Sequence, residues 1–413
     1  MRKVLISGAG IAGTTLAYWL RQHGFAPTVV ERAPAPRVGG HAVDIRGTAL
    51  GVVDRMGVLG RLRELSTGMR GMSFVNGAGK TLVRVTDHTL TGGLTDSEDV
   101  EILRDDLTGT LASVAQEGVE YVYGDWITGI AQRTDGVRVT FARGEARDFD
   151  LVVGADGQHS AVRSLVFGAE KQFSHYLGTC LAVFTVPNFL DLDRWQTFHM
   201  TPGKLAGLYS ARKNTEARAM LGFQSPEIDY DRYDVEQQRK LIADRFLGHG
   251  WEVPRLLREM ESSELYFDSM TQIRMDRFTD GRVALVGDAG YGPSPLSGQG
   301  TSLALVGAYV LAGSLAASLD HRAAFASYER EIRPFVRQNQ ALASMNQKKQ
   351  TRFRQWKQIQ SMRLLPYLPL RGRVMKAAMR PLTEAANGLV LKDYRSLGVS
   401  GTGACRESHF RDA

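Results

Sequence analysis

Runs of apolar residues mark short buried strands at the start of the chain and again near residue 150. Lys3–Ser7, Thr28–Val30 and Phe149–Gly154 are largely apolar, as expected where helices cover both faces of a parallel sheet. Between the first two runs, Thr14–His23 predicts a helix that ends at Gly24. A strand, a helix and a second strand in this order predict an α/β fold.

Shorter elements fill the region between these strands. An Asn-Gly pair at Asn76 favours a hairpin turn. The pattern of apolar and polar residues in the rest of this region is typical of short strands and helices. We expect helices at Thr48–Met56, Leu59–Leu65 and Asp105–Glu117, a hairpin of Met72–Val75 with Thr81–Val85, and strands at Glu101–Leu103, Tyr121–Tyr123, Thr128–Arg133 and Val137–Ala142.

Residues from Leu177 to Ile273 have a different pattern, in which short strands follow one another with turns between them. Strands are predicted at Leu181–Val186, Trp195–Met200, Lys204–Ala211 and Arg218–Gln224, and helices at Val235–Phe246 and Val253–Ser262. This indicates a mostly antiparallel sheet inserted into the first domain. Gly281–Gly287 is again typical of a buried strand in a parallel sheet. A helix at Gly300–Ser318 and a long basic helix from Arg322 to about Met362 follow it.

Composition is that of a soluble globular protein, with 43% hydrophobic and 23% charged residues among 413. Cys180 and Cys405 are too far apart in the sequence to suggest a metal site or a disulfide framework, so a reducing cytoplasm is expected. The chain enters a strand at once, without the regions of a signal peptide. Thr301–Leu319 lacks charges, but its Gly, Ala and Ser content favours a helix buried in the protein over a membrane span.

The net charge of +7 comes from one segment, because Met345–Arg380 holds ten Lys and Arg residues and no acid. A solvated face of a long helix is the favoured interpretation. Trp356, Leu364, Leu365 and Tyr367 are interleaved with the cations, so attraction to a membrane surface is an alternative. We expect no membrane contact, and no motif supports nucleic-acid binding.

Gly8, Gly10 and Gly13 join the first strand to the first helix, and Glu31 ends the second strand. In this pattern the first glycine permits a tight turn, the second admits a pyrophosphate close to the backbone, and the third lets helix pack on strand. The helix N-terminus favours an anion, and Glu31 can accept from a ribose hydroxyl. The stretch predicts dinucleotide binding, and its site includes Ile11, Ala12 and Arg32.

Two later stretches carry further binding signals. Asp156 and Gly157 form a turn just beyond a strand, where open α/β sheets bind ligands. Asp288 ends another strand, where its carboxylate can hold a sugar-like chain. Pro295 and the Gly298-Gln299-Gly300 turn follow, and these glycines let backbone N–H groups approach a planar ring at the start of a helix.

The three stretches, in this order, resemble the class A FAD-dependent aromatic monooxygenases, the para-hydroxybenzoate hydroxylase-like group. The chain is most similar to the short members that include tetracycline-modifying enzymes, over Lys3 to about Arg337. The resemblance implies that the glycine motif and Glu31 bind the ADP half of FAD, with Arg104 near the diphosphate. It also implies that Asp288 holds the ribityl chain, that Gly298–Gly300 lie beside the isoalloxazine, and that Asp156 and Gly157 serve FAD and NAD(P)H.

The predicted fold class is therefore a Rossmann-like FAD-binding domain with an inserted, mostly antiparallel sheet and a long C-terminal helix. We assign residues 1–175 and 274–330 to the FAD-binding domain and 176–273 to a substrate domain. Residues 331–395 are expected to form a C-terminal helical segment, and 396–413 a tail.

The activity implied by the resemblance is hydroxylation of a small aromatic or polycyclic, polyketide-like substrate. NADPH or NADH reduces FAD, O2 gives a C4a-hydroperoxyflavin, and that species transfers the hydroxyl. Three departures touch the surroundings of the flavin and leave the substrate open: Gly290-Tyr291, where many relatives have Ala-His, Ser302 in place of a frequent Asn, and Gly307 in place of a frequent Asp. Arg46 lies where relatives place a basic residue beside the flavin.

No residue stands out as a required catalytic group, since His41, His159 and His199 are each more often structural than catalytic. The inserted sheet is expected to form a roof over the substrate. Alternation places Gln196, Phe198 and Met200 on one face and Trp195, Thr197 and His199 on the other, without indicating which face meets the flavin. The substrate-binding residues we predict are Phe198, Met200, Tyr209, Phe223, Pro295 and Leu296.

Two other functional classes remain open. The first is a different flavoenzyme on the same frame, such as an epoxidase, a Baeyer–Villiger-type oxygenase or a reductase. A halogenase is disfavoured because its tryptophan-rich signature is absent. The second is a non-catalytic dinucleotide-binding protein that uses its basic C-terminal segment at a membrane surface.

Overall fold

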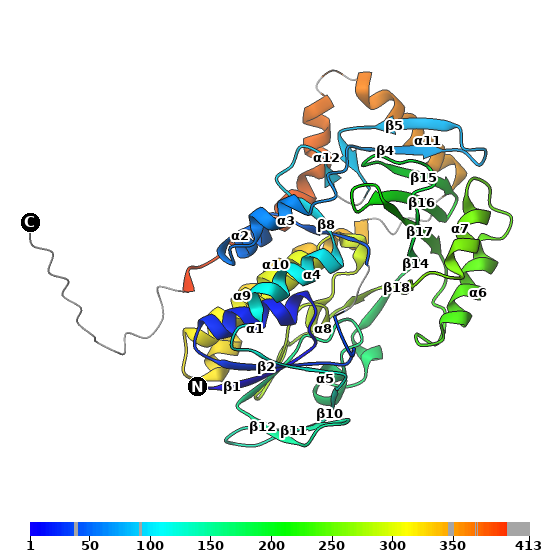
Figure 1. Cartoon of the computed structure of the whole chain (residues 1–413). Helices are drawn as coiled ribbons and strands as arrows, with labels where there is room; N and C mark the ends of the chain where they lie inside the picture. The colour runs from blue at the N-terminus through cyan, green and yellow to red at the C-terminus, as the bar shows by residue number, and fades with distance from the viewer. Residues whose placement is uncertain (37–39, 91–92, 346–350, 368, 370, 395–413) are drawn as a thin grey trace, which may run out of the picture.

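A six-stranded sheet lies at the centre of the first domain in the computed structural model, which describes residues 1–413 except 37–39, 91–92, 346–350, 368, 370 and 395–413 (Figure 1). From edge to edge its strands are β19 (Thr279–Asp280), β20 (Val283–Leu285), β13 (Leu151–Gly154), β1 (Lys3–Ser7), β2 (Ala26–Glu31) and β9 (Glu120–Tyr123). Neighbours run parallel except β19 and β20. The predicted parallel sheet is confirmed.

Helices and a small sheet cover the two faces of these strands. On one face lie α1 (Ile11–Gln22), α4 (Arg104–Ala115) and α9 (Gly300–Ala316), which share a large apolar core with β1 and β2. On the other face lie α5 (Ala161–Val166) and the sheet of β10 (Ile127–Gln132), β11 (Val137–Phe141) and β12 (Arg147–Phe149). The predicted strand at 149–154 is thus divided at Asp150 between two sheets.

Every residue of α9 from Thr301 to Leu315 is buried, which confirms that this uncharged stretch is a core helix. Among the described residues, no helix combines the length and the apolar character needed to cross a membrane. Smaller elements complete this part: β3 (Ala42–Ile45), α2 (Thr48–Arg55), α3 (Leu59–Glu64), β6 (His88–Thr89), β7 (Gly93–Leu94), β8 (Val100–Leu103), η1 (Glu170–Gln172), α8 (Asp288–Tyr291) and η2 (Pro295–Ser297).

A seven-stranded, mostly antiparallel sheet forms the second layer, as predicted. Its order is β18 (Leu265–Ile273), β14 (Ser174–Pro187), β17 (Glu216–Gln224), β16 (Lys204–Ala211), β15 (Gln196–Thr201), β4 (Met72–Val75) and β5 (Thr81–Val85). The outer face packs on α6 (Val235–Phe246) and α7 (Val253–Met260). Strand β18 was absent from the predicted elements.

The predicted hairpin of β4 and β5 is confirmed, but it belongs to this second sheet. Strand β4 pairs in parallel with β15, so Phe74 lies opposite Phe198. The sheet assigned to residues 176–273 therefore takes two of its strands from residues 72–85. The division of the chain into domains stays a prediction. Its residue ranges group the hairpin of β4 and β5 with the FAD-binding domain, whereas the hairpin pairs with the seven-stranded sheet.

The C-terminal part is a series of helices rather than the predicted single helix to Met362. Helix α10 (His321–Met345) is followed by α11 (Arg352–Leu364), η3 (Leu365–Tyr367) and α12 (Arg371–Ala386). Thr351 is extended, with φ −112° and ψ 160°, and its hydroxyl accepts a hydrogen bond from the backbone N–H of Arg354, which caps α11. The single-helix prediction is wrong because Thr351 begins a new helix.

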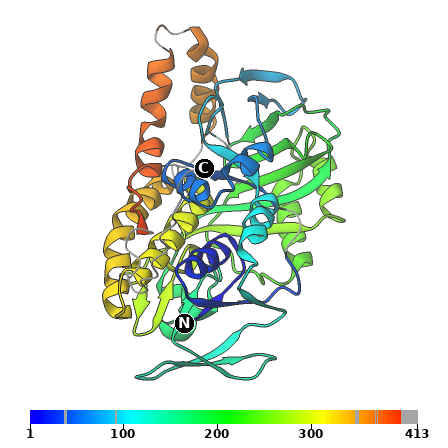
Figure 2. The ribbon, with the colours of Figure 1, turned by 60° about the vertical axis from the view of Figure 1, so that its left-hand side comes forward.

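Helices α11 and α12 stand with β4 and β5 at one end of the molecule, opposite the sheet of β10 to β12 (Figures 1 and 2). Beyond α12 the chain returns to the first domain as a strap, residues 387–394. The Thr48 hydroxyl donates to the carbonyl of Leu389, and Lys392 forms an ion pair with Glu331 of α10. The helix pair is thus connected to α10 at one end and held on it again at the other.

Candidate active site

One cavity of about 1620 Å³ lies between the carboxyl ends of the parallel strands and the inner face of the seven-stranded sheet. A site for one drug-sized molecule occupies roughly 300–1,000 Å³, so this space can hold a cofactor and a substrate together. Most of the predicted site residues line it: Gly8, Gly10, Ile11, Ala12, Glu31, Arg32, Arg46, Arg104, Asp156, Gly157, Met200, Tyr209, Phe223, Asp288, Pro295, Leu296, Gly298 and Gly300. Gly13, Phe198 and Gln299 do not.

The glycine turn before α1 has the geometry that its spacing predicts. Gly8 has φ +103°, and a Cβ at Gly13 would lie 1.9 Å from the carbonyl oxygen of Gly8. A Cβ at Gly10 would meet nothing within 4 Å, because this position opens on the cavity. The first turn of α1 has no acid and no side-chain cap, so its N–H groups can bind an anion.

Glu31 ends β2 beside this turn. Its carboxylate accepts hydrogen bonds from the backbone N–H groups of Ala9 and Ala33, both at 2.9 Å. The neighbouring Arg32, which lines the cavity, donates to the hydroxyl of Tyr233 at 2.8 Å in the loop before α6. Both residues are therefore fixed in place at this end of the cavity.

Asp156 braces the turn that follows β13 instead of extending into open space. Its carboxylate accepts from the Ser160 hydroxyl at 2.5 Å and from the backbone N–H groups of Ala161 and Val162 at 2.9 and 3.2 Å. Burial raises the pKa of Asp156, and these hydrogen bonds oppose the rise. Its observed role is to fix the loop and the start of α5. A direct contact with a cofactor stays a prediction.

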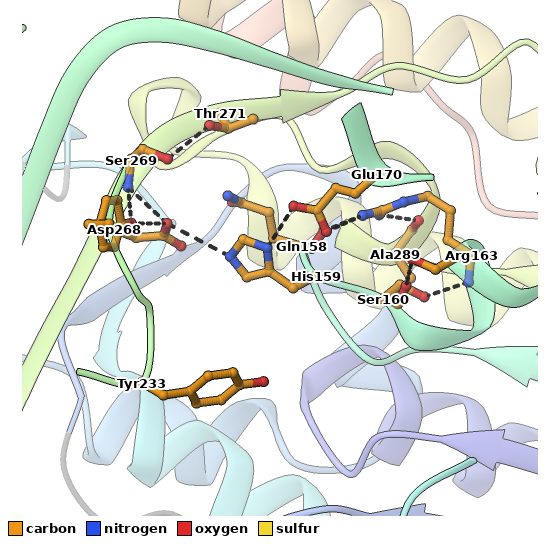
Figure 3. Close-up of polar contacts among 12 residues, drawn as sticks. Gln158, His159, Ser160, Arg163, Glu170, Tyr233, Asp268, Ser269, Thr271 and Ala289 are labelled. Carbon is orange, nitrogen blue, oxygen red and sulfur yellow. Dashed lines mark hydrogen bonds and ion pairs between the residues drawn. The ribbon is translucent and has the colours of Figure 1, made fainter. Parts of the chain in front are cut away.

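His159, in the same loop, lies between two carboxylates (Figure 3). Its Nδ1 is 2.8 Å from Glu170 Oε1, and its Nε2 is 3.9 Å from Asp268 Oδ1 on β18. Arg163 is fully buried and pairs with the second oxygen of Glu170 at 3.0 Å. The chain of charges ties the Asp156 loop to the edge of the second sheet, which gives His159 a structural role.

Asp288 projects into the cavity at the start of α8. Among the described residues nothing is hydrogen-bonded to its carboxylate, and the side chain is exposed to the cavity. The protein around the cavity separates this carboxylate from bulk water and raises its pKa, while the nearby Arg104 opposes the rise. An unpaired carboxylate beside an arginine can accept hydrogen bonds from ligand hydroxyls, as a ribityl chain would require.

The turn before α9 presents its backbone to the same space. Gly298 is left-handed at φ +63°, and Gly300 begins a helix whose first turn has neither an acid nor a side-chain cap. Gln299 is completely buried, and its side-chain amide has no partner among the described residues. Gln299 does not line the cavity, and its contact with a cofactor stays a prediction.

Two departures from the family pattern compensate for each other. A Cβ at Gly307 would lie 1.9 Å from the hydroxyl oxygen of Tyr291. That hydroxyl is 2.9 Å from the hydroxyl of Tyr328, which donates to the carbonyl of Leu285. The ring of Tyr291 thus fills space that a larger residue at 307 would need. The third departure, Ser302, accepts from the backbone N–H of Arg46 at 3.1 Å.

Arg46 is buried at the joint between the two sheets, with ion pairs to Asp44 at 3.0 Å and Asp99 at 3.4 Å. Burial raises the pKa of Asp44 to about 7; Arg46 opposes this rise, and the carboxylates of Glu101 and Asp99 add to it. The guanidinium of Arg46 therefore interacts electrostatically with three carboxylates. A contact with flavin stays a prediction for Arg46.

Arg104 and His41 meet beside the cavity. The backbone N–H of Arg104 donates to the carbonyl of His41, whose ring packs on Tyr266 at 5.1 Å. Burial and the charge of Arg104 lower the pKa of His41 to about 4, so its imidazole is neutral at pH 7. His199 is placed elsewhere, with Nδ1 at 3.1 Å from the carbonyl of Val75.

The inner face of the seven-stranded sheet, here called the roof, carries Gln196, Phe198 and Met200. Met200 lies opposite Leu205, and Gln196 opposite Tyr209, whose hydroxyl accepts from the backbone N–H of Ala42 in the first domain. Directly paired residues share one face of a sheet. The face that carries Gln196, Phe198 and Met200 is therefore the one turned toward the cavity.

Two predicted substrate residues lie differently from the rest. Phe198 is completely buried and packs against Phe74 at 5.9 Å, so Phe74 and not Phe198 lines the cavity. The ring of Phe223 contacts Phe246 of α6 and Phe267 on the outer face, although its strand borders the cavity. Met200 lines the cavity, and Tyr209 borders it although its side chain is completely buried. Substrate contact stays a prediction for all of them.

Sequence reasoning missed the contribution of the C-terminal helices to this site. Gln355, Gln358 and Met362 of α11 and Met379 and Leu382 of α12 line the cavity. The basic residues around them suggested a solvated helix, and no local pattern marks the inner face. Asp268 and Tyr266 were missed because strand β18 itself was not predicted.

The uncapped helix starts, the open space at Gly10 and the unpaired carboxylate of Asp288 fit a dinucleotide with a long polyol chain and a planar ring. The FAD binding domain family matches residues 1–343, and the chain belongs to this family. With its flavin-dependent monooxygenase homologues, this makes the protein an FAD-dependent monooxygenase.

The relatives extend the match beyond the cofactor domain. A flavin-dependent monooxygenase of Legionella longbeachae is 39% identical over 340 residues, covering 82% of this chain and 87% of that protein. The crystal structure of tetracycline destructase Tet(51) is 34% identical and covers 95% of this chain and 100% of that one, with a TM-score of 0.83. Tetracycline destructase Tet(55) is 36% identical and covers 95% and 99%, with a TM-score of 0.81.

Proposed function

We propose that the protein uses NADPH or NADH and O2 to hydroxylate an aromatic or polycyclic, polyketide-like compound. The observation that carries this is the single cavity, which contains the cofactor residues at one end and an apolar roof at the other. The tetracycline destructases among its structural relatives support a flat polycyclic substrate. We place the protein in the cytoplasm.

Bound FAD supplies the chemistry, since its reduction by a nicotinamide nucleotide lets it activate O2 and donate a hydroxyl group. Gly8–Gly13 and Glu31 would hold the ADP half, and Arg104 would bind near the diphosphate. Asp288 would accept hydrogen bonds from the ribityl hydroxyls, and the N-terminus of α9 would stabilise negative charge on the ring. The reductant binds near the loop of Asp156 and Gly157.

The roof positions the substrate and excludes water from the reacting centre. Met72, Phe74 and Met220 give it an apolar surface, and the hydroxyl of Tyr209 adds a polar group at the edge. Pro295 and Leu296 contact the substrate from the side of the flavin ring. Residues 1–175 and 274–330, without the hairpin of β4 and β5, form the cofactor half of the protein, and 176–273 with that hairpin form the substrate half.

The proposal is tested by oxidation of NADPH and NADH by the flavin-loaded enzyme with tetracyclines and smaller phenols. We expect substrate-stimulated consumption and a product heavier by one oxygen atom, with little peroxide release. Leu319→Ser, exposed at the end of α9, is the control variant and should behave as wild type. NAD(P)H consumption that no compound stimulates would contradict the proposal. An epoxide or a ring-expanded lactone would identify one of the alternative flavoenzyme reactions.

A further inference from the structure

The segment Met345–Arg380, which includes α11, η3 and most of α12, carries a strongly uneven charge. The chain has 51 basic and 44 acidic residues, and ten of the basic ones lie in Met345–Arg380; removing them leaves 41 against 44. The adjoining hairpin adds Lys80 and Arg84, and residues 70–86 contain no acid. Arg363 of α11 donates to the carbonyl of Leu82, which joins the two parts into one surface.

Large apolar side chains stand among these cations. Phe353 and Trp356 of α11 are 65% and 57% exposed, and their rings stack at 6.1 Å. Leu364 and Tyr367 are 59% and 85% exposed. We call this set, with the neighbouring cations Lys357, Arg373 and Lys376, the aromatic–basic surface.

The exposed apolar residues of α11 lie on a different side of the helix from the apolar residues that pack on the roof. Ile359 and Met362 face the roof and pack with Phe74 and Met72 in a core cluster. Phe353, Trp356 and Leu364 recur at helical spacing on the opposite side. Helix α11 is therefore apolar on both sides, and its outer side has no protein partner among the described residues.

We propose that the aromatic–basic surface docks the enzyme on an anionic phospholipid bilayer. Cations are attracted to the negative surface of a cytoplasmic leaflet, and Trp, Tyr and Phe side chains enter the interface between headgroups and acyl chains. Lysines keep their charge in water while their stems lie along the apolar boundary. The sequence alone favoured a solvated helix, and the stacked, exposed rings change that expectation.

Two other occupants fit the surface less well. A second copy of the chain in a twofold dimer would place the same patch on both sides, so the cations of one copy would face those of the other. A nucleic acid would explain the cations and could stack on the rings, but it gives no role to the aliphatic Leu364 and Val374, which are 59% and 46% exposed.

The same helices border the cavity, since Met362, Met379 and Leu382 line it. A docked enzyme would therefore hold its substrate cavity next to the lipid, where flat polycyclic compounds concentrate. This consequence rests on the proposed function. The docking itself does not, and the two can be tested separately.

Docking is tested by sedimentation of the FAD-loaded, full-length protein with vesicles of phosphatidylglycerol and phosphatidylcholine, and with pure phosphatidylcholine. We expect binding to the anionic vesicles that weakens from 0.05 to 0.5 M NaCl, as the Debye length shortens. Phe353→Ser with Trp356→Ser, and separately Lys357→Glu with Lys376→Glu, should each reduce the partition coefficient at least about tenfold. Leu247→Ser with Arg63→Glu, exposed on other surfaces, should leave it unchanged.

The outcomes separate the possible partners. Equal sedimentation of wild type and both aromatic–basic variants, or no binding to anionic vesicles at low salt, would overturn the proposal. A wild-type dimer in light scattering that becomes a monomer in Phe353→Ser with Trp356→Ser would overturn it in favour of a second copy. Duplex DNA binding without vesicle binding would do so in favour of a nucleic acid. Turnover of a water-soluble substrate without vesicles measures the proposed function alone.

Discussion

The two walls of the cavity are built in different ways. The cofactor wall consists of short turns at strand ends, where Gly8, Gly13 and Gly298 have conformations or close contacts that a side chain would disturb. The roof is a regular sheet whose lining residues come from six strands and two C-terminal helices. The cofactor wall depends on backbone geometry, whereas the roof depends on side-chain packing.

This difference predicts how the walls respond to mutation. A changed backbone position alters every contact to the cofactor, so substitutions in the cofactor wall should remove flavin or the fold. A changed side chain in the roof alters one patch of a large apolar surface, so the flavin should remain while the use of substrate changes. The predictions below test this contrast, from the largest effect to the smallest.

Gly13→Ala should have the largest effect, because its Cβ would lie 1.9 Å from a backbone oxygen. We expect the free energy of unfolding to fall by about 3 kcal/mol or more, seen as a Tm lower by roughly 3–4 °C or more for a chain of 413 residues. Gly10→Ala is the matched control, since its Cβ meets nothing within 4 Å. It should leave the apoprotein stable and weaken only FAD binding. Equal loss of apoprotein stability in both variants would contradict the assigned roles.

Asp288→Ala should weaken FAD binding by roughly 10–100-fold, the value of one or two hydrogen bonds to a charged group. Asp288→Asn keeps one acceptor, so its affinity for FAD should lie between those of Asp288→Ala and wild type. Fluorescence titration of the apoproteins with FAD measures both, and thermal unfolding of the same samples is the control. Wild-type affinity in Asp288→Ala would show that this carboxylate does not hold the ribityl chain.

Asp44→Asn probes the joint between the walls. Its pKa of about 7 is above the value in an unfolded chain, so the folded state binds the extra proton. The contribution of this proton to the free energy of unfolding is fully present below about pH 4 and is lost as the pH rises through about 7. Between pH 5.5 and 7.5, wild type should therefore lose about 2 kcal/mol relative to Asp44→Asn. Parallel urea curves at these two pH values measure this; an unchanged difference would contradict it.

Met220→Ala, in the roof, should have the smallest effect on the protein and act only on turnover. Flavin content and the rate of flavin reduction should stay within about twofold, while KM rises about fivefold for the loss of roughly 1 kcal/mol of apolar contact. The fraction of NAD(P)H that ends as peroxide should also increase. Loss of flavin from Met220→Ala would break the contrast between the walls.

The same contrast explains which features the sequence could predict. The parallel strands, the glycine turn and the buried helix α9 are encoded in short, continuous segments, and all were predicted. The pairing of Phe74 with Phe198 joins strands that are more than a hundred residues apart, and no local pattern indicates it. Residues such as Met362 and Leu382 could not be placed in the site for the same reason.

Two errors in the elements have their own physical causes. Strand β18 has mixed polar and apolar residues because Asp268 faces the cavity and His159, so its alternation is incomplete. The division at Thr351 occurs where no Pro or Gly marks a break, and the hydroxyl cap that starts α11 resembles an ordinary mid-helix threonine in sequence. The contacts of Glu31, Arg46 and Arg104 with FAD stay predictions.

The strap of residues 387–394 determines how the helix pair can vary. Besides the Lys392–Glu331 ion pair, Asn339 of α10 donates to the carbonyl of Ala385, so the end of α12 is fixed beside the helix from which the pair departs. The FAD-binding family match ends at residue 343, just before this departure. Since both attachment points belong to one helix, we expect α11 and α12 to be exchangeable as a single segment. Grafting the corresponding segment of a relative between these points would transfer its surface and its share of the roof while the cofactor wall stays in place.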